Sequence, residues 1–197
     1  RARGTENGER GGWGARERGW WDGTRIDALL PPRAGGDARL LEAMRYATLG
    51  GGKRRRGYLA VTTGGLFDIP QAQAARVGAA VEMLHAYSLV HDDLPAMDDD
   101  DMRRGQPSTH RKFDEATAIL AGDALQTKAF EILAASATHP SADARPDLIS
   151  AFAAASGAAG MVGGQMIDMD GEGRAPPCAP VRPLPAPKTG RLPPPSA

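Results

Sequence analysis

Six aspartates lie within ten residues near the middle of the chain, and two adjacent arginines follow them directly. Carboxylates so close together repel one another and cannot be buried without partners. An apolar segment leads into this run, so we interpret the carboxylates as facing a cavity, where Mg²⁺ completes its octahedron with water and phosphate oxygens. The forked guanidinium groups of the arginines suit the same phosphates. The sequence therefore predicts a metal and diphosphate site, formed by Asp92, Asp93, Asp98–Asp101, Arg103 and Arg104.

The spacing of the aspartates requires a break in the helix that carries the first of them. Asp98 follows Asp92 by six residues, which is roughly 240° around a straight helix. Pro95 cannot continue the helical hydrogen bonds and clashes with the carbonyl of His91. We therefore predict that the backbone leaves the helix near residues 94–97 and brings Asp98 back beside Asp92.

The aspartate pair, the later Asp98 and the Arg-Arg-Gly sequence resemble the first aspartate-rich motif of the trans-prenyl (polyprenyl) diphosphate synthases. The bacterial farnesyl-type members are the most similar. Other motifs of this family match in the same order, and the resemblance covers roughly residues 40–173 with a weaker match beyond. The matching segments are GGKRRR at 51–56, AILAGDALQT at 118–127, GGQMIDMD at 163–170 and KTG at 188–190.

The resemblance implies an all-α fold, a bundle of antiparallel helices around a central cavity. It also implies that isopentenyl diphosphate elongates an allylic diphosphate, dimethylallyl or geranyl diphosphate, to farnesyl diphosphate. Mg²⁺ would be held by Asp92, Asp93 and Asp98, and the catalytic residues would be Asp92, Asp98 and Arg103. The substrate-binding residues that the resemblance implies are Lys53, Arg56, His85, Arg103, Arg104, Gln165, Lys188 and Thr189.

Two residues of the same apolar helix are expected to limit the length of the product. Tyr87 and Ser88 lie roughly 6–8 Å before the metal ligands, because each helical residue rises about 1.5 Å. The growing prenyl chain must pass this level, and in the family bulk at these positions stops elongation. Helix geometry alone places Ser88 nearer to the face of Asp92, so the role of Tyr87 follows from the resemblance.

Composition restricts the class of protein. The 197 residues are 41% hydrophobic, which is enough for the core of one domain or a large part of one. The 24 basic and 24 acidic residues balance, so we expect no nucleic-acid partner. Cys178 is the single cysteine, which fits a reducing cytoplasm. No apolar run approaches the roughly 18 residues of a membrane span.

We expect three segments along the chain. Residues 1–36 are rich in Gly and Arg and are predicted to be disordered or non-native, residues 37–173 form the helical domain, and residues 174–197 form a Pro-rich disordered tail. Helices are predicted from Asp37 to a glycine stop at 50–52, and then at 59–67, 71–92, 117–133 and 148–168.

The family carries a second aspartate-rich motif on a later helix, yet this sequence has no aspartate after Asp170. We therefore expect a bundle that is incomplete on its C-terminal side, and a homodimer for a complete chain. Two other classes stay open: a non-catalytic partner subunit or inactive fragment, and a type I terpene cyclase. The basic segment Lys53–Arg56 argues against the cyclase, which needs no second diphosphate site.

Overall fold

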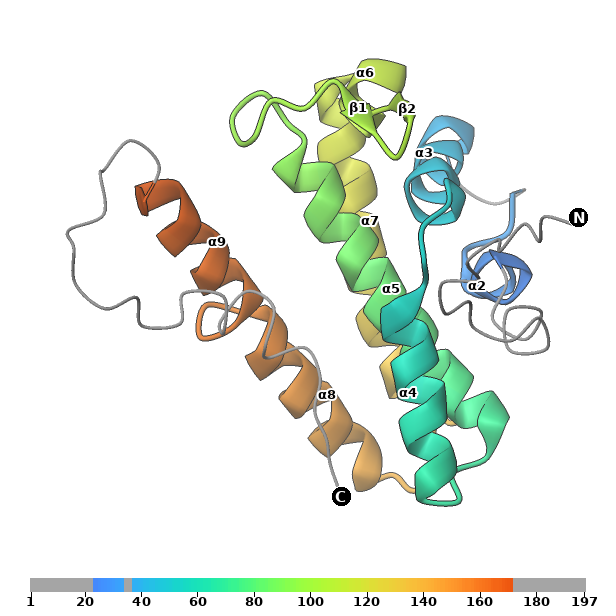
Figure 1. The fold of residues 1–197 in the computed structure, drawn as a ribbon. Coiled ribbons are helices and arrows are strands. Elements are labelled where there is room, and N and C mark those ends of the chain that lie inside the picture. The colour runs from blue at the N-terminus through green and yellow to red at the C-terminus, as the bar shows by residue number, and fades with distance from the viewer. Residues whose placement is uncertain (1–22, 34–36, 172–197) are drawn as a thin grey trace, which may run out of the picture.

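The computed structural model describes residues 23–33 and 37–171, and this part of the chain is all-α apart from a short hairpin (Figure 1). This confirms the predicted fold class. The helices are α2 (Gly23–Leu29), α3 (Ala38–Leu49), α4 (Arg55–Leu66), α5 (Gln71–Asp92), α6 (Thr109–Lys112), α7 (Glu115–Ala134), α8 (Ala144–Ser156) and α9 (Met161–Gly171). The hairpin pairs β1 (Met102–Arg103) with β2 (Gln106–Pro107).

The long helix α5 is the centre of the fold, with α4 and α7 packed against it (Figure 1). Small residues let α5 and α7 approach closely, so their shared core contains many alanines beside a few large side chains. Burial of such apolar surface is the main stabilising contribution to a helical bundle. The fully buried residues here include Ala79, Ala80, Met83 and Leu84 of α5, and Ala121, Leu125, Ala129 and Leu133 of α7.

The predicted helix boundaries of the central domain have local causes. The Asp37 side chain accepts a hydrogen bond from the backbone N–H of Leu40 and so caps α3. The helix ends before Gly50, at the predicted glycine stop. Pro70 precedes α5, which spans the predicted range, Gln71–Asp92. The start of α4, which carries the basic segment, packs against the half of α5 that leads to the aspartates, because Gly57 of α4 bonds to Glu82 of α5.

Two predictions of secondary structure need correction. The helix expected at 148–168 is divided into α8 and α9, because the chain turns at Gly157, where the N–H of Gly160 bonds to the Gly157 carbonyl. The N-terminal segment was expected to lack structure, but α2 lies within it and buries Ile26 completely. Arg45 of α3 fastens this helix by donating to Asp27 at 2.7 Å.

Residues 1–22 and 34–36 of the predicted N-terminal segment, and the whole predicted tail at 174–197, lie outside the described residues. Among the helices that the structure describes, none combines the length and apolar character that crossing a membrane requires.

Candidate functional site

The chain turns back on itself where α5 ends. After Asp92 the helix gives way to turns, and the backbone N–H of Asp98 donates to the carbonyl of Asp92 at 2.8 Å. The N–H of Asp99 bonds in the same way to the carbonyl of Leu94, at 3.2 Å. The predicted return of Asp98 beside Asp92 is confirmed. Asp92 is half-buried and Asp98 is exposed at this turn.

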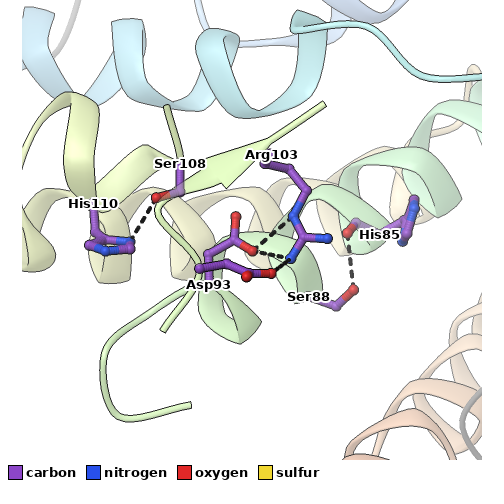
Figure 2. Close-up of polar contacts among 7 residues, drawn as sticks. His85, Ser88, Asp93, Arg103, Ser108 and His110 are labelled. Carbon is purple, nitrogen blue, oxygen red and sulfur yellow. Dashed lines mark hydrogen bonds and ion pairs between the residues drawn. The ribbon is translucent and has the colours of Figure 1, made fainter. Parts of the chain in front are cut away.

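Asp93 is paired with an arginine of the hairpin. Its side chain is buried, and it accepts hydrogen bonds from Arg103, from Nε at 2.8 Å and from Nη2 (Figure 2). Arg103 Nη2 also donates to Asp100 Oδ2 at 3.0 Å. Burial raises the pKa of Asp93, while the hydrogen bond from Arg103 acts in the opposite direction. The same hydrogen bond raises the pKa of Arg103. Asp93, one of the three predicted metal ligands, is thus paired with a cation.

The Arg-Arg-Gly sequence forms a tight hairpin turn. Arg103 pairs with Gln106 across the two strands, so Arg104 and Gly105 are the two turn residues. Both have positive φ, 55° and 78°, as a type I′ turn requires. Glycine adopts this conformation without steric cost, which explains Gly105. The turn sends the two arginine side chains to different neighbours.

Arg104 packs against the glycine loop between α3 and α4. Its Nη1 donates to the carbonyl of Gly51. A Cβ added to Gly52 would lie 2.7 Å from the Arg104 Cζ, and Gly52 has a φ of 108°. The sequence indicated these glycines as a helix stop and as the start of the GGKRRR segment, whereas the structure shows that Gly52 also leaves the space for a guanidinium group. Tyr46 of α3 holds the hairpin in place, because its hydroxyl donates to the carbonyl of Pro107 at 2.7 Å.

His85 lies on α5 in a strongly cationic environment. Burial and then the charge of Arg56 lower the pKa of its imidazole to about 3, with further contributions from Arg104, Arg54 and Arg103. The imidazole is therefore neutral at pH 7, and the surrounding guanidinium groups favour an anion. The structure thus brings together residues from three predicted motifs: the basic segment, the α5 face and the Arg-Arg-Gly turn.

The other predicted substrate-binding residues lie at several places in the structure. Arg56 is half-buried at the start of α4, and Lys53 is exposed in the loop before it. Gln165 lies on α9, which contacts mainly α8 and stands apart from α5 (Figure 1). The structure does not bring Gln165 to the cations around His85. Lys188 and Thr189 lie outside the described residues.

The two residues predicted to limit product length occupy one turn of α5. Tyr87 is half-buried and meets the His91 ring edge to face, with 4.8 Å between the ring centroids. Burial raises the pKa of Tyr87, as do Asp123 and Asp92. The Ser88 hydroxyl donates to the carbonyl of His85 at 3.0 Å (Figure 2).

Oxygen donors at the end of α5 have the chemistry that Mg²⁺ prefers. Mg²⁺ is usually bound by one or two carboxylates, and substrate phosphates and water supply the other ligands. The hydrogen bond from Asp98 to Asp92 keeps two such carboxylates on one turn. No three His, Cys, Asp or Glu side chains are grouped to hold a metal ion within residues 23–33 and 37–171. The donor chemistry at the end of α5 is therefore of the type that Mg²⁺ takes, but the three predicted ligands Asp92, Asp93 and Asp98 are not grouped around one point in this part of the chain.

Sequence reasoning missed Glu82, which is buried on α5 although its side chain is charged. Its carboxylate accepts a hydrogen bond from the backbone N–H of Gly57 at 3.0 Å and lies 3.6 Å from Arg54 Nη1. The available signal was a glutamate within an apolar helix, between Val81 and Met83. A charge in such a place is rarely buried without a partner.

Comparison with known proteins identifies the family. The profile of the Polyprenyl synthetase family matches residues 37–177, and the chain belongs to this family. Farnesyl diphosphate synthase of Escherichia coli (strain K12) is 52% identical over 168 residues, which are 85% of this chain and 56% of the relative.

Two solved structures have the same fold. An FPP/GFPP synthase from Zymomonas mobilis superposes with a TM-score of 0.79 at 49% identity, covering 85% of this chain and 61% of its own. A geranyltransferase from Legionella pneumophila gives 0.78 at 39% identity, covering 86% and 60%. The chain thus spans about half the length of the curated relatives it matches.

Proposed function

We propose that the protein is a prenyltransferase that joins an allylic diphosphate to isopentenyl diphosphate and yields farnesyl diphosphate. The observation that carries the proposal is the set of guanidinium groups around a neutral His85, next to the carboxylates at the end of α5. Cations from two separate motifs beside paired carboxylates suit two diphosphates, one bound by cations and one shared with a metal. The names of the relatives support the same reaction.

Isopentenyl diphosphate fits the cations that are not paired with aspartate. The charges of Arg56 and Arg104 act on the imidazole of His85, and the exposed Lys53 precedes Arg56 by three residues in the same segment. Burial lowers the pKa of Arg104, as does its neighbour Arg54, so a bound anion would relieve an unfavourable concentration of positive charge. In this proposal the diphosphate is held by Lys53, Arg56, His85 and Arg104. The double bond of isopentenyl diphosphate is then left free to attack.

The allylic diphosphate is assigned to the other side of the hairpin. Asp92 and Asp98 would hold Mg²⁺, which supplies positive charge to a departing diphosphate. Arg103 would donate hydrogen bonds to the same group as the allylic C–O bond breaks, and Asp93 orients its guanidinium. The double bond of isopentenyl diphosphate then forms the new C–C bond, and the released diphosphate takes the proton lost from that product. Water must be excluded, because it would capture the cation.

The assembly and location belong to the same proposal. We infer a homodimer from the family, and a cytoplasmic location from the single Cys178. Tyr87 and Ser88 are proposed to set the product length from their turn of α5, and Lys188 and Thr189 to complete the diphosphate contacts.

The proposal is tested by supplying geranyl diphosphate with Mg²⁺, with and without isopentenyl diphosphate. A longer diphosphate that forms only with both substrates supports it. A hydrocarbon formed from geranyl diphosphate alone would indicate a terpene cyclase, and no product would indicate a non-catalytic chain. Lys53→Ala and Arg56→Ala should raise KM for isopentenyl diphosphate more than for the allylic substrate. Arg55→Ala is the matched control, because Arg55 is an exposed neighbour in the same segment.

A further inference from the structure

Glu82 is a buried charge with no role in the proposed chemistry. The exposed fraction of its side chain is 4%, and the residue lies in the middle of α5. Removing an ionised carboxylate from water has a large free-energy cost unless the carboxylate gains hydrogen-bond or ion-pair partners. The partners of Glu82 therefore indicate the role of this buried carboxylate.

Both partners belong to the start of α4. The first N–H groups of a helix lack acceptors within the helix, and a nearby negative charge is favourable there. The N-cap residue Arg54 makes no side-chain capping bond and has a left-handed backbone, with φ of 48°. Glu82 replaces the missing cap from a neighbouring helix, through the Gly57 N–H at 3.0 Å and the Arg54 guanidinium at 3.6 Å. Arg54 is also fixed by its bond to the carbonyl of Thr48.

The capped turn carries the cations of the proposed acceptor site. Arg56 lies between the two residues that Glu82 contacts, and Lys53 comes directly before them. His85 follows Glu82 by three residues and so lies on the same face of α5. Fixing the α4 terminus on Glu82 therefore also fixes the direction from which Arg56 approaches His85.

We propose that Glu82 is a positioning residue for the binding of isopentenyl diphosphate. From α5 it caps the start of α4, and it thereby holds Arg56 and Lys53 on the side of α4 that faces His85. The inference rests on the proposed function for the identity of the anion. The cap itself depends only on the contacts of Glu82.

Backbone amide exchange tests the cap without any substrate. Glu82→Ala should increase exchange of the Gly57 N–H about tenfold, the effect of losing one charge-assisted hydrogen bond. Glu82→Gln keeps an acceptor oxygen and the shape of the side chain, so its effect should be smaller and its fold intact. Glu131→Gln is the control, because Glu131 is exposed and pairs with Lys128 on α7. Unchanged exchange at Gly57 in Glu82→Ala would overturn the cap.

Calorimetric titration of the full chain tests the positioning role. Isopentenyl diphosphate should bind about tenfold more weakly to Glu82→Ala, while the affinity for geranyl diphosphate changes less than about twofold. Glu82→Gln should recover part of the loss. Equal losses for both ligands would indicate a purely structural role and overturn the inference, as would unchanged affinity for isopentenyl diphosphate. If the wild-type chain bound neither diphosphate, the proposed function and the positioning role would both fail, and Gly57 exchange would still decide whether Glu82 caps α4.

Discussion

Gly122 of α7 leaves the space that the imidazole of His91 occupies on α5. A Cβ added to Gly122 would overlap the His91 Nε2 and Cδ2 atoms. The ring is held there by Ile119, whose carbonyl oxygen is 3.1 Å from Nε2. Asp123 Oδ1 lies 3.9 Å from the same nitrogen. The close approach of the two helices at this point fixes the residue that precedes Asp92.

Gly122→Ala should destabilise the fold by about 1–3 kcal/mol, the usual effect of forcing extra volume into a packed interface. The measurement is chemical denaturation. Gly65→Ala is the control, because Gly65 is an exposed helical glycine with no atoms within 4 Å of an added Cβ. The control should be neutral or more stable by about 0.5–1 kcal/mol. If both variants were equally stable, His91 would have room that the structure does not show.

Asp92→Ala should abolish elongation while changing the free energy of unfolding by less than about 1 kcal/mol. Turnover should fall by at least about 10², because one of two proposed metal ligands is removed. Steady-state rates and denaturation of the same preparation separate the two effects. Asp147→Ala, an exposed acid on α8, serves as the control. A near-normal rate in Asp92→Ala would move the metal site elsewhere.

The stability of the protein should depend on pH through His85. The unfolded chain protonates this residue below pH about 6.5. Burial and the neighbouring arginines lower the pKa in the folded state to about 3. Between these values the unfolded state binds more protons, so stability falls as the pH falls from about 6.5 toward 3.

His85→Gln should remove this dependence. As the pH falls, the free energy of unfolding should decrease less steeply in the variant than in wild type. The difference between the two slopes is at most about 1.4 kcal/mol per pH unit. It is smaller to the extent that solvent screens the half-buried ring. Urea denaturation at several pH values between 7 and 4.5 measures the difference. Parallel curves for the two proteins would show that His85 is protonated in the folded state as readily as in the unfolded chain.

Tyr87→Ala should lengthen the product of the active enzyme beyond farnesyl diphosphate. The ring is the bulk on the turn of α5 before Asp92, and its removal leaves space beside His91. Product length is measured by chromatography of the dephosphorylated alcohols. Tyr87→Phe is the control, because it keeps the aromatic ring and removes only the hydroxyl, so its product should stay at farnesyl length. An unchanged farnesyl product from Tyr87→Ala would assign this residue to packing.

The helices were predictable where local chemistry determines their ends. The cap at Asp37, the glycine stop at Gly50 and the break caused by Pro95 are all properties of neighbouring residues, and the structure contains each of them. The return of Asp98 to Asp92 follows from that break. These features required no knowledge of packing.

The missed features depend on residues distant in sequence. Glu82 caps a helix that begins 27 residues earlier, at Arg55, and no local pattern specifies that partner. The pairing of Asp93 with Arg103 likewise depends on the hairpin, which brings the two side chains together, and no local pattern specifies it. The division between α8 and α9 was not predictable, because each of several glycines weakens a helix and none of them alone determines where it ends.

The type I′ turn has a thermodynamic consequence for the proposed reaction. One peptide bond joins Arg103, which faces Asp93, to Arg104, which faces Gly51, so the two guanidinium groups share one backbone. Whichever diphosphate binds first would restrict the motion of that backbone and meet part of the ordering cost for the other. Binding of the two substrates would then be cooperative, and by linkage each would increase the affinity for the other by the same factor.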